Sequence, residues 1–260
     1  MNLTDLYGQV MDAAEGLEGT FSFSIHEGGN SVGYQAQLPM KAASTIKVPI
    51  LIEAFHLHEQ GLVDLSDSLQ IHDSDKVPGA GVLQSMQQRT ISLVDALSLM
   101  IVVSDNCATN LVIDHLGLER CQNDFKKWGL RQISLERKMM DYASREAGKE
   151  NWISSEDLIQ SLKLINESSF LNGQNQKWMI NILENQQFRD KLPYFIHDDE
   201  IMVANKTGEI EGVENDCAIF TYMNRTLYCA VLTGGLRRED DGQRIIRHIG
   251  DKIANYLYSI

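Results

Sequence analysis

The 260-residue sequence has few basic residues, few prolines and no low-complexity segment. Its 23 Lys and Arg are outnumbered by 36 Asp and Glu, and the resulting formal charge of −13 argues against binding to nucleic acid or to anionic membrane surfaces. Only 4 prolines are present, and a hydrophobic content of 43% excludes a disordered linker. What remains is a globular chain that is long enough for a sizeable core.

As written, the sequence leads us to expect neither a membrane span nor an export signal. Its best apolar run, residues 93–103, is interrupted by Asp95 and Ser98 and suits a core helix better. The N-terminus has no basic segment followed by an apolar one, so we expect a cytoplasmic protein, or an extracellular or periplasmic one if a leader was removed. We expect neither a membrane nor a nucleic acid among its partners.

The four cysteines have none of the CxxC spacing that zinc and redox sites require; they are Cys107, Cys121, Cys217 and Cys229. In a chain without a leader we expect them to be free, buried thiols. The seven histidines are scattered along the sequence. We therefore expect no metal ion and no cofactor.

Hydrophobic periodicity predicts strands at both ends of the chain. An amphipathic helix with Thr4 as its N-cap opens the sequence, and a hairpin follows over residues 21–37. Near the C-terminus, three alternating stretches and a last helical pattern predict strands at 201–207, 217–222 and 227–232 and a helix at 243–257. The residues between these two groups are mainly helical.

This arrangement predicts an α+β fold, an α/β sandwich. Both chain ends would form one antiparallel sheet flanked by the terminal helices, and an all-α domain would be inserted between them. We expect the sheet domain to comprise residues 1–45 and 195–260, and the helical domain residues 46–194. An active site would lie at the interface of the two domains.

The segment Ser44-Thr45-Ile46-Lys47 opens a predicted helix, so Ser44 and Lys47 lie one turn apart on the same face. A lysine with a lowered pKa can accept the proton of a serine hydroxyl and make it a nucleophile. The helix N-terminus adds positive potential near a developing oxyanion. Taken alone, the same segment is also compatible with a solvated helix start.

Two further motifs follow in order. Ser104-Asp105-Asn106 separates two helical stretches, and Lys206-Thr207-Gly208 ends a predicted strand. Each alone is compatible with an ordinary cap or turn. Together, SxxK, SDN and KTG in this order form the signature of the penicillin-recognising serine enzymes, and the chain resembles class A β-lactamases most. The resemblance extends over nearly the whole chain.

The resemblance implies a role for each polar residue of the first two motifs. Ser44 would be the acylated nucleophile and Lys47 its activating base. Ser104 would relay a proton towards the leaving nitrogen. Asn106 would brace Lys47 and the side chain of the substrate.

The third motif would bind the substrate. Lys206 would supply positive potential and Thr207 would hydrogen-bond the substrate carboxylate, while Gly208 leaves room for the substrate backbone. The backbone N–H groups of Ser44 and Glu209 would form the oxyanion hole. The site would thus be locally cationic within an acidic protein.

One departure from the family concerns the base that removes the acyl group. Aligning Leu135-Glu136-Arg137 with the family's leucine-acid-arginine segment puts Met139 where class A enzymes have their deacylating glutamate. A thioether cannot accept a proton. Glu136 and Asp141 are the nearest replacements, although for Glu136 we favour an ion pair with Arg137 or another loop residue.

A second departure concerns the family's arginine on the strand after KTG. The comparable position falls near Asp216. One of Arg237, Arg238 or Arg244 could replace it, but we favour a solvated surface charge for each.

The resemblance therefore implies a β-lactamase-like serine hydrolase that forms an acyl-enzyme on Ser44, with slow or unusual deacylation because of Met139. Its partner would be a β-lactam, or a related amide or ester with a carboxylate, and we expect a monomer. Two alternatives stay open. One is an esterase or D-amino-acid peptidase or amidase on the same scaffold, and the other is a penicillin-binding or sensor protein without turnover.

Overall fold

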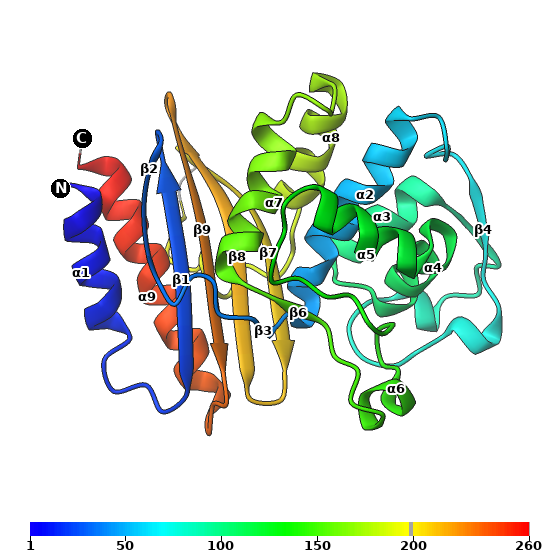
Figure 1. The fold of residues 1–260 in the computed structure, drawn as a ribbon, viewed down its shortest axis with the longest axis horizontal. Coiled ribbons are helices and arrows are strands. Elements are labelled where there is room, and N and C mark those ends of the chain that lie inside the picture. The colour runs from blue at the N-terminus through cyan, green and yellow to red at the C-terminus, as the bar shows by residue number, and fades with distance from the viewer. Residues whose placement is uncertain (198–199, 260) are drawn as a thin grey trace.

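The computed structural model describes residues 1–197 and 200–259. Its centre is an antiparallel five-stranded sheet with the strand order β2-β1-β9-β8-β7 (Figure 1). The strands come from both ends of the chain, which confirms the predicted α+β fold class. They are β1 (Thr20–Glu27), β2 (Asn30–Tyr34), β7 (Ile201–Ile210), β8 (Val213–Tyr222) and β9 (Arg225–Gly234).

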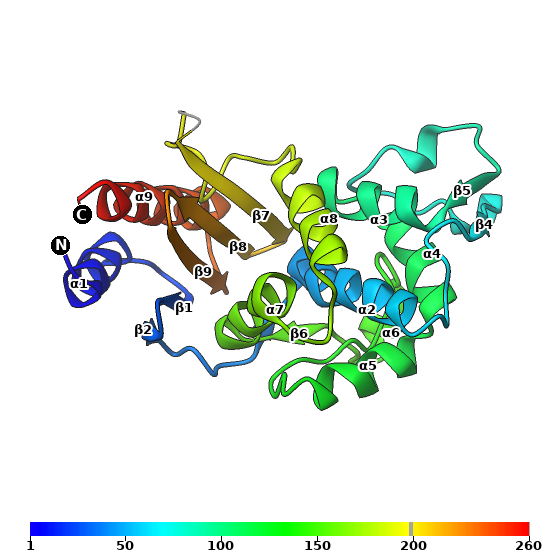
Figure 2. The same ribbon diagram turned by 90° about the horizontal axis from the view of Figure 1, so that it is seen from above.

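The sheet is covered on both faces. Helices α1 (Leu3–Ala13) and α9 (Glu239–Tyr258) lie side by side on one face, near both chain ends, and the remaining helices lie on the other side (Figures 1 and 2). Successive side chains of β8 point to opposite faces of the sheet. Ala218 and Phe220 belong to the core that includes α1 and α9, whereas Cys217 and Ile219 belong to the core of the helical region.

The first helix begins two residues earlier than predicted. Asn2, and not Thr4, is the N-cap: its Oδ1 accepts from Asp5 N at 3.0 Å, and Asp5 Oδ2 accepts from Asn2 N at 2.9 Å. This reciprocal capping box satisfies two backbone N–H donors at the start of the helix. Thr4 lies within the first turn and does not cap it.

The helical region surrounds α2 (Lys47–Glu59). Ile50, Leu51 and Ile52 are three successive positions that face different sides of the helix, and all three are fully buried. The other helices are α3 (Leu93–Val102), α4 (Asn106–Leu116), α5 (Leu118–Lys127), α6 (Tyr142–Glu146), α7 (Ser155–Glu167) and α8 (Gly173–Glu184), with short strands β3 (Met40–Lys41), β4 (Ser68–Gln70), β5 (Thr90–Ser92) and β6 (Trp152–Ile153).

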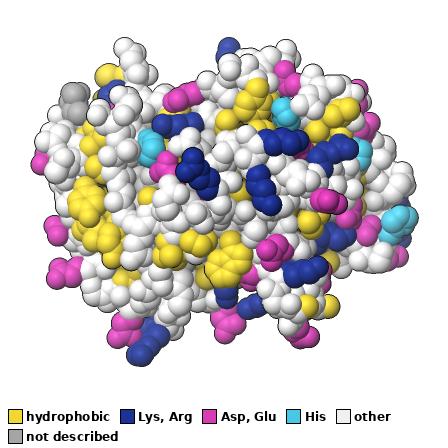
Figure 3. All heavy atoms as spheres, in the orientation of Figure 1, with side chains coloured by type: hydrophobic (Ala, Val, Ile, Leu, Met, Phe, Trp, Pro, Cys, Tyr) yellow, Lys and Arg dark blue, Asp and Glu magenta, His cyan; other side chains and the backbone are white. Residues whose placement is uncertain are grey.

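All four cysteines are free and buried, as predicted. Within residues 1–197 and 200–259, no helix combines the length and the apolarity that crossing a membrane requires. Basic side chains extend across the middle of one face of the molecule, with acidic ones scattered around them (Figure 3). The division into two domains near residues 45 and 195 stays a prediction.

Glu53 is an acidic residue inside the core of the helical region. Its side chain is fully buried on α2, and neither carboxylate oxygen has a hydrogen-bond partner among the described residues. Burial, reinforced by the nearby Asp124 carboxylate, raises the pKa of Glu53 from 4.5 to about 8. The folded protein therefore keeps a proton that the unfolded chain loses, and stability falls as the pH rises from 4.5 through about 8.

We expect Glu53→Gln to raise the free energy of unfolding by about 1–3 kcal/mol at alkaline pH and much less at acidic pH. Below pH 4.5 the wild-type carboxyl is neutral in both states, so the two proteins differ little there. Urea denaturation of both proteins at several pH values measures the difference. Glu119→Gln, at an exposed position on α5, is the matched control. A gain that does not change with pH would contradict the assignment to Glu53 ionisation.

Candidate active site

Ser44 lies in the short turn η1 (Ala43–Ile46) that leads into α2, and it is partly exposed. The residue before it, Ala43, has φ 45°, a left-handed conformation that alanine rarely adopts. Strained backbone of this kind persists only where surrounding contacts hold it, and it clusters at functional sites. One such contact is the Thr45 hydroxyl, which donates to the Ala42 carbonyl oxygen at 2.7 Å. Ser44 thus lies on a strained turn that a neighbouring hydrogen bond holds in place.

Lys47 is fully buried one helical turn after Ser44. Its Nζ donates to the Ser104 carbonyl oxygen at 2.7 Å, to Ser104 Oγ at 3.1 Å and to Asn106 Oδ1 at 3.1 Å. Among the described residues, no hydrogen bond joins this Nζ to Ser44. Burial and the nearby Lys206 charge lower the pKa of Lys47 well below its usual range. The lower pKa favours the neutral amine, which is the form that can accept a proton.

Ser104 joins the two lysines of the motifs. Its Oγ lies 3.1 Å from Lys47 Nζ and 3.1 Å from Lys206 Nζ, and its backbone φ is 54°. Lys206 is fully buried on β7 and also donates to the Thr207 carbonyl oxygen at 2.8 Å. Burial lowers the pKa of Lys206 to about 7. Residues from α2, the loop before α4, and β7 therefore share one polar network.

Asp105, the middle residue of the second motif, holds this loop in place. Its Oδ2 accepts from the backbone N–H groups of Val82 and Leu83, both at 2.7 Å, and its Oδ1 accepts from Ala108 N at 2.9 Å. It therefore caps α4 and clamps the 80–83 segment at the same time. No local sequence pattern indicates this role, because its two N–H partners lie more than twenty positions away.

Gly208 lets the edge strand approach the serine turn. A Cβ on this residue would lie 3.0 Å from Thr45 N and 3.1 Å from Ser44 N, so a larger residue would push the two backbones apart. The next residue, Glu209, has an exposed side chain. The backbone of the third motif therefore lies close to the backbone of Ser44.

The pairing of β7 with β8 fixes the direction of the Glu209 N–H group. Ile210 and Val213 pair across a two-residue turn, and such a closing pair can only be a hydrogen-bonded one. Hydrogen-bonded pairs alternate, so Gly208 pairs in the same way with its partner, and Glu209 lies between two such pairs. Because β7 is an edge strand, the Glu209 N–H points away from the sheet.

Two adjacent hollows are both lined by Ser44. The first has a volume of about 360 Å³ and is lined by Ser104, Thr207 and Lys191, among others. The second, of about 330 Å³, is lined by Asn106 and Met139 together with residues of the 137–151 segment. Ser44 borders both, so a substrate with two arms could be held across it.

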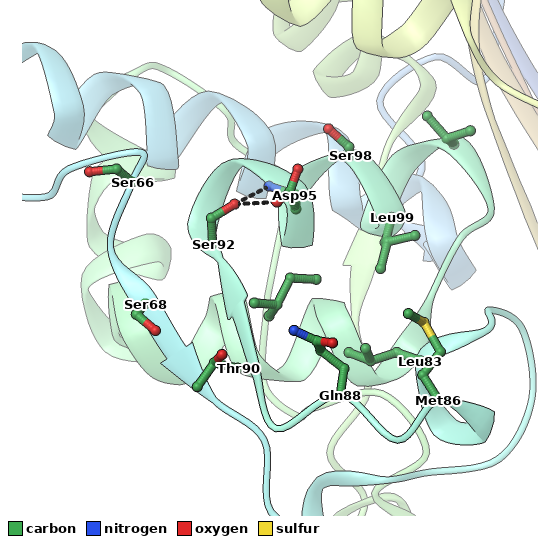
Figure 4. Close-up of a pocket in the computed structure, with 12 residues that line it drawn as sticks. Ser66, Ser68, Leu83, Met86, Gln88, Thr90, Ser92, Asp95, Ser98 and Leu99 are labelled. Carbon is green, nitrogen blue, oxygen red and sulfur yellow. Dashed lines mark hydrogen bonds between the residues drawn. The ribbon is translucent and has the colours of Figure 1, made fainter.

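A larger hollow lies elsewhere, between β4, β5 and α3 (Figure 4). Its volume is about 640 Å³, and the Ser92 hydroxyl donates to Asp95 at 2.6 Å on its wall. None of the motif residues is among those that line it. The chemistry that the motifs suggest therefore belongs to the two hollows beside Ser44.

A sequence model of the Beta-lactamase enzyme family matches residues 3–257. The chain belongs to this family. It is 28% identical to a β-lactamase from Sphaerobacter thermophilus, with a TM-score of 0.90 over 100% of this chain and 99% of that one. It is 25% identical to a PBP-A mutant in an acyl-enzyme complex with penicillin G, with a TM-score of 0.89 over 99% and 98% of the two chains.

Among curated proteins, the chain is 33% identical to a β-lactamase of Rhodobacter capsulatus over 105 residues, which are 39% of this chain. The match spans only 36% of that relative. The chain is also 24% identical to the β-lactamase CARB-3 of Pseudomonas aeruginosa, over 60% of this chain and 56% of that protein. The family and the fold are thereby shown, whereas the roles of individual residues stay predictions.

In this β-lactamase-family chain, Met139 lines the second hollow, and the Asn110 side chain hydrogen-bonds its backbone. Asn110 Oδ1 accepts from Met139 N at 2.8 Å, and Asn110 Nδ2 donates to Met139 O at 3.0 Å. Neither Glu136 nor Asp141 is among the described residues that line the two hollows. Glu136 is exposed, and Asp141 caps α6 by accepting from Ser144 N at 3.0 Å.

Arg137, one of the partners expected for Glu136, pairs with another carboxylate. It pairs with the buried Glu150, whose Oε1 lies 2.6 Å from the Arg137 terminal nitrogen and 2.9 Å from its Nε. Glu136 instead accepts from the Glu150 backbone N–H at 3.3 Å. The sequence does not point to Glu150, since no local pattern distinguishes a glutamate thirteen residues after the arginine.

Among the described residues, no arginine of the C-terminal region lines either hollow beside Ser44. Arg237 pairs with exposed Glu18, Arg244 is exposed beside Asp241, and Arg238 is exposed before α9. Asp216 is fully buried, and its carboxylate accepts hydrogen bonds from Leu192 N at 3.0 Å and from Asn205 Nδ2 at 3.2 Å. Burial raises the pKa of Asp216 to about 6. Other cations lie closer to Ser44: Lys191, which belongs to none of the motifs, lines the first hollow, and Arg137 and Arg145 line the second.

Proposed function

We propose that the protein is a β-lactamase-type serine hydrolase that forms an acyl-enzyme on Ser44. The observation that carries the proposal is the network around Ser104 Oγ, which lies 3.1 Å from both Lys47 Nζ and Lys206 Nζ. Three motifs that are far apart in the sequence meet there, beside a partly exposed serine on a strained turn. A purely structural role would not need two buried lysines around one hydroxyl.

In the proposed acylation, the neutral amine of Lys47 accepts the proton of Ser44 as the serine oxygen attacks the β-lactam carbonyl carbon. The carbonyl oxygen becomes an oxyanion, which the N–H groups of Ser44 and Glu209 stabilise. The carbon–nitrogen bond then breaks, and the Ser104 hydroxyl delivers a proton to the leaving nitrogen. Lys47, which holds the proton taken from Ser44, reprotonates Ser104 through their hydrogen bond.

Substrate binding in this proposal relies on the first hollow. Thr207 lines this hollow beside Ser44, and the buried Lys206 lies behind it with its Nζ 3.1 Å from Ser104 Oγ. Thr207 would hydrogen-bond the substrate carboxylate, and Lys206 would supply positive potential to it. With a pKa of about 7, Lys206 loses its charge as the pH rises through neutrality, so an anionic substrate is bound less well at alkaline pH.

Hydrolysis of the acyl-enzyme is proposed to be slow. In this proposal Met139 stands where the family has its deacylating glutamate. The two carboxylates suggested by the sequence, Glu136 and Asp141, are not among the described residues that line the hollows. A general base contributes about 10²–10⁴-fold to such a step. The protein would therefore accumulate a long-lived adduct, as a penicillin-binding protein without turnover also would.

We expect a fluorescent penicillin to label the protein with one adduct per chain, located on Ser44. Intact-mass spectrometry followed by peptide mapping measures both, and Ser44→Ala is the control that should stay unlabelled. An unlabelled wild type, or equal labelling of Ser44→Ala, would contradict the proposal. Hydrolysis of simple p-nitrophenyl esters without any penicillin adduct would favour the esterase alternative instead.

A further inference from the structure

Lys191 is a buried lysine that none of the three motifs contains. It lies in the segment before β7, with its side chain only 1% exposed. Its Nζ lies 2.5 Å from Glu214 Oε2 and donates to the Gly208 carbonyl oxygen at 3.1 Å and to the Asn215 carbonyl oxygen at 3.4 Å. The exposed Glu209 carboxylate lies farther away, with Oε2 3.9 Å from the same Nζ. The ammonium is thus fixed between the Glu214 carboxylate and the backbone of two paired strands.

A gain in stability does not by itself explain why the Lys191–Glu214 ion pair is buried. Removing two charges from water is expensive, and well-packed apolar residues of similar size are often as stable or more so. The Glu214 carboxylate is fully buried, and burial raises its pKa. What an apolar pair could not supply is a positive charge at the Gly208 carbonyl oxygen.

That carbonyl belongs to the same planar peptide as the Glu209 N–H. The C=O and N–H of a trans peptide point in opposite directions, so the group that fixes one also fixes the other. Lys191 holds the oxygen on the β8 side, while the strand pairing directs the N–H towards the open edge. A charge on the oxygen side also polarises the amide and makes its N–H a stronger donor.

We propose that Lys191 is a positioning residue that orients and polarises the Gly208–Glu209 peptide, one half of the oxyanion hole. Glu214 keeps the ammonium in place. The inference rests on the proposed acylation of Ser44, and it assigns Lys191 an effect on the rate of acylation and not on the initial binding of substrate.

The test compares Lys191→Met with wild type in single-turnover acylation by a chromogenic cephalosporin. We expect the acylation rate constant to fall by about 10–10²-fold, because a misplaced, weaker donor costs less than a deleted one. The dissociation constant of the initial complex should change little. In the acyl-enzyme formed with penicillin, the infrared band of the ester carbonyl should move to higher wavenumber, since its oxygen is less polarised.

Two further variants make the result specific. Lys163→Met removes a half-buried lysine of α7 that contacts His26, away from both hollows, and should acylate like wild type. Lys191→Met/Glu214→Gln leaves no unpaired buried charge, so it provides the same measurement if the single variant does not fold. It should be as slow as Lys191→Met, because the charged donor that Lys191 adds at the Gly208 oxygen is missing in both.

Three outcomes would overturn the inference while the wild type still forms its adduct. The first is an unchanged rate constant and carbonyl band in Lys191→Met. The second is wild-type acylation in the double variant, which would show that Lys191 only neutralises Glu214. The third is a weaker initial complex with an unchanged rate constant, which would place Lys191 in direct contact with substrate. A wild type that forms no adduct at all would instead refute the proposed function.

Discussion

Replacing Lys47 by methionine is expected to lower the rate constant of Ser44 acylation by about 10²–10⁴-fold at neutral pH. The methionine side chain fills nearly the same volume, but it cannot accept a proton from the serine. The backbone of α2 should be preserved, because Lys47 is surrounded by the well-packed start of that helix. Stopped-flow acylation by a chromogenic cephalosporin measures the rate constant directly.

The pH dependence of the acylation rate constant shows whether Lys47 acts as a base or only as a positive charge. Burial and the charge of Lys206 lower the pKa of Lys47, so in wild type the amine becomes protonated only as the pH falls, and acylation declines on that acid side. In Lys47→Met this decline should disappear, while any effect of Lys206 on the alkaline side remains.

Lys47→Arg is the control for this prediction. It keeps a positive charge near Ser104 but has a side chain that does not lose its proton in proteins. It should therefore be slow as well. Near-normal acylation in Lys47→Arg, or a loss below tenfold in Lys47→Met, would show that another group takes the proton of Ser44.

The predictable part of the site consisted of residues whose neighbours in the sequence form a recognisable motif. Lys47 follows Ser44 by one helical turn, and Lys206 precedes Gly208 on one strand, so local spacing already indicates their relation. The strands at both chain ends were predictable for a similar reason, since alternation of apolar residues is a local signal.

The unpredicted residues are those whose partners are distant in the sequence. Lys191 contacts Gly208 and Glu214 only after the chain has turned into the sheet, and Glu150 meets Arg137 only across a folded loop. Asp105 likewise finds its N–H partners in another segment. A charged residue in a turn usually indicates a solvated surface, and only the packing shows that these three are buried.

The second large effect is expected at position 139, where we predict that Met139→Glu speeds hydrolysis of the acyl-enzyme by about 10²–10⁴-fold. Methionine and glutamate have the same number of atoms between Cβ and the end of the chain. Asn110 holds the backbone of residue 139 through both its N–H and its C=O, so the new side chain starts from the same place. Its carboxylate would enter the hollow that borders Ser44.

Two measurements give the rate of deacylation. The first is the decay of the adduct mass after free penicillin is removed, and the second is the time course of nitrocefin hydrolysis. Wild type should release about one product per chain in a burst and then continue slowly, because acylation is faster than hydrolysis. In Met139→Glu the burst should merge into steady turnover and the adduct should become short-lived.

Met139→Gln decides whether the gain comes from a base. Glutamine has the length and polarity of glutamate and can orient a water molecule, but it cannot take a proton from it. Its adduct should decay as slowly as that of wild type. If Met139→Gln and Met139→Glu are equally fast, the methionine limits deacylation by excluding water. Steady turnover of nitrocefin by wild type, without a burst, would instead show that a base already serves the site, and the buried Glu150 beside Arg137 would be the first carboxylate to replace.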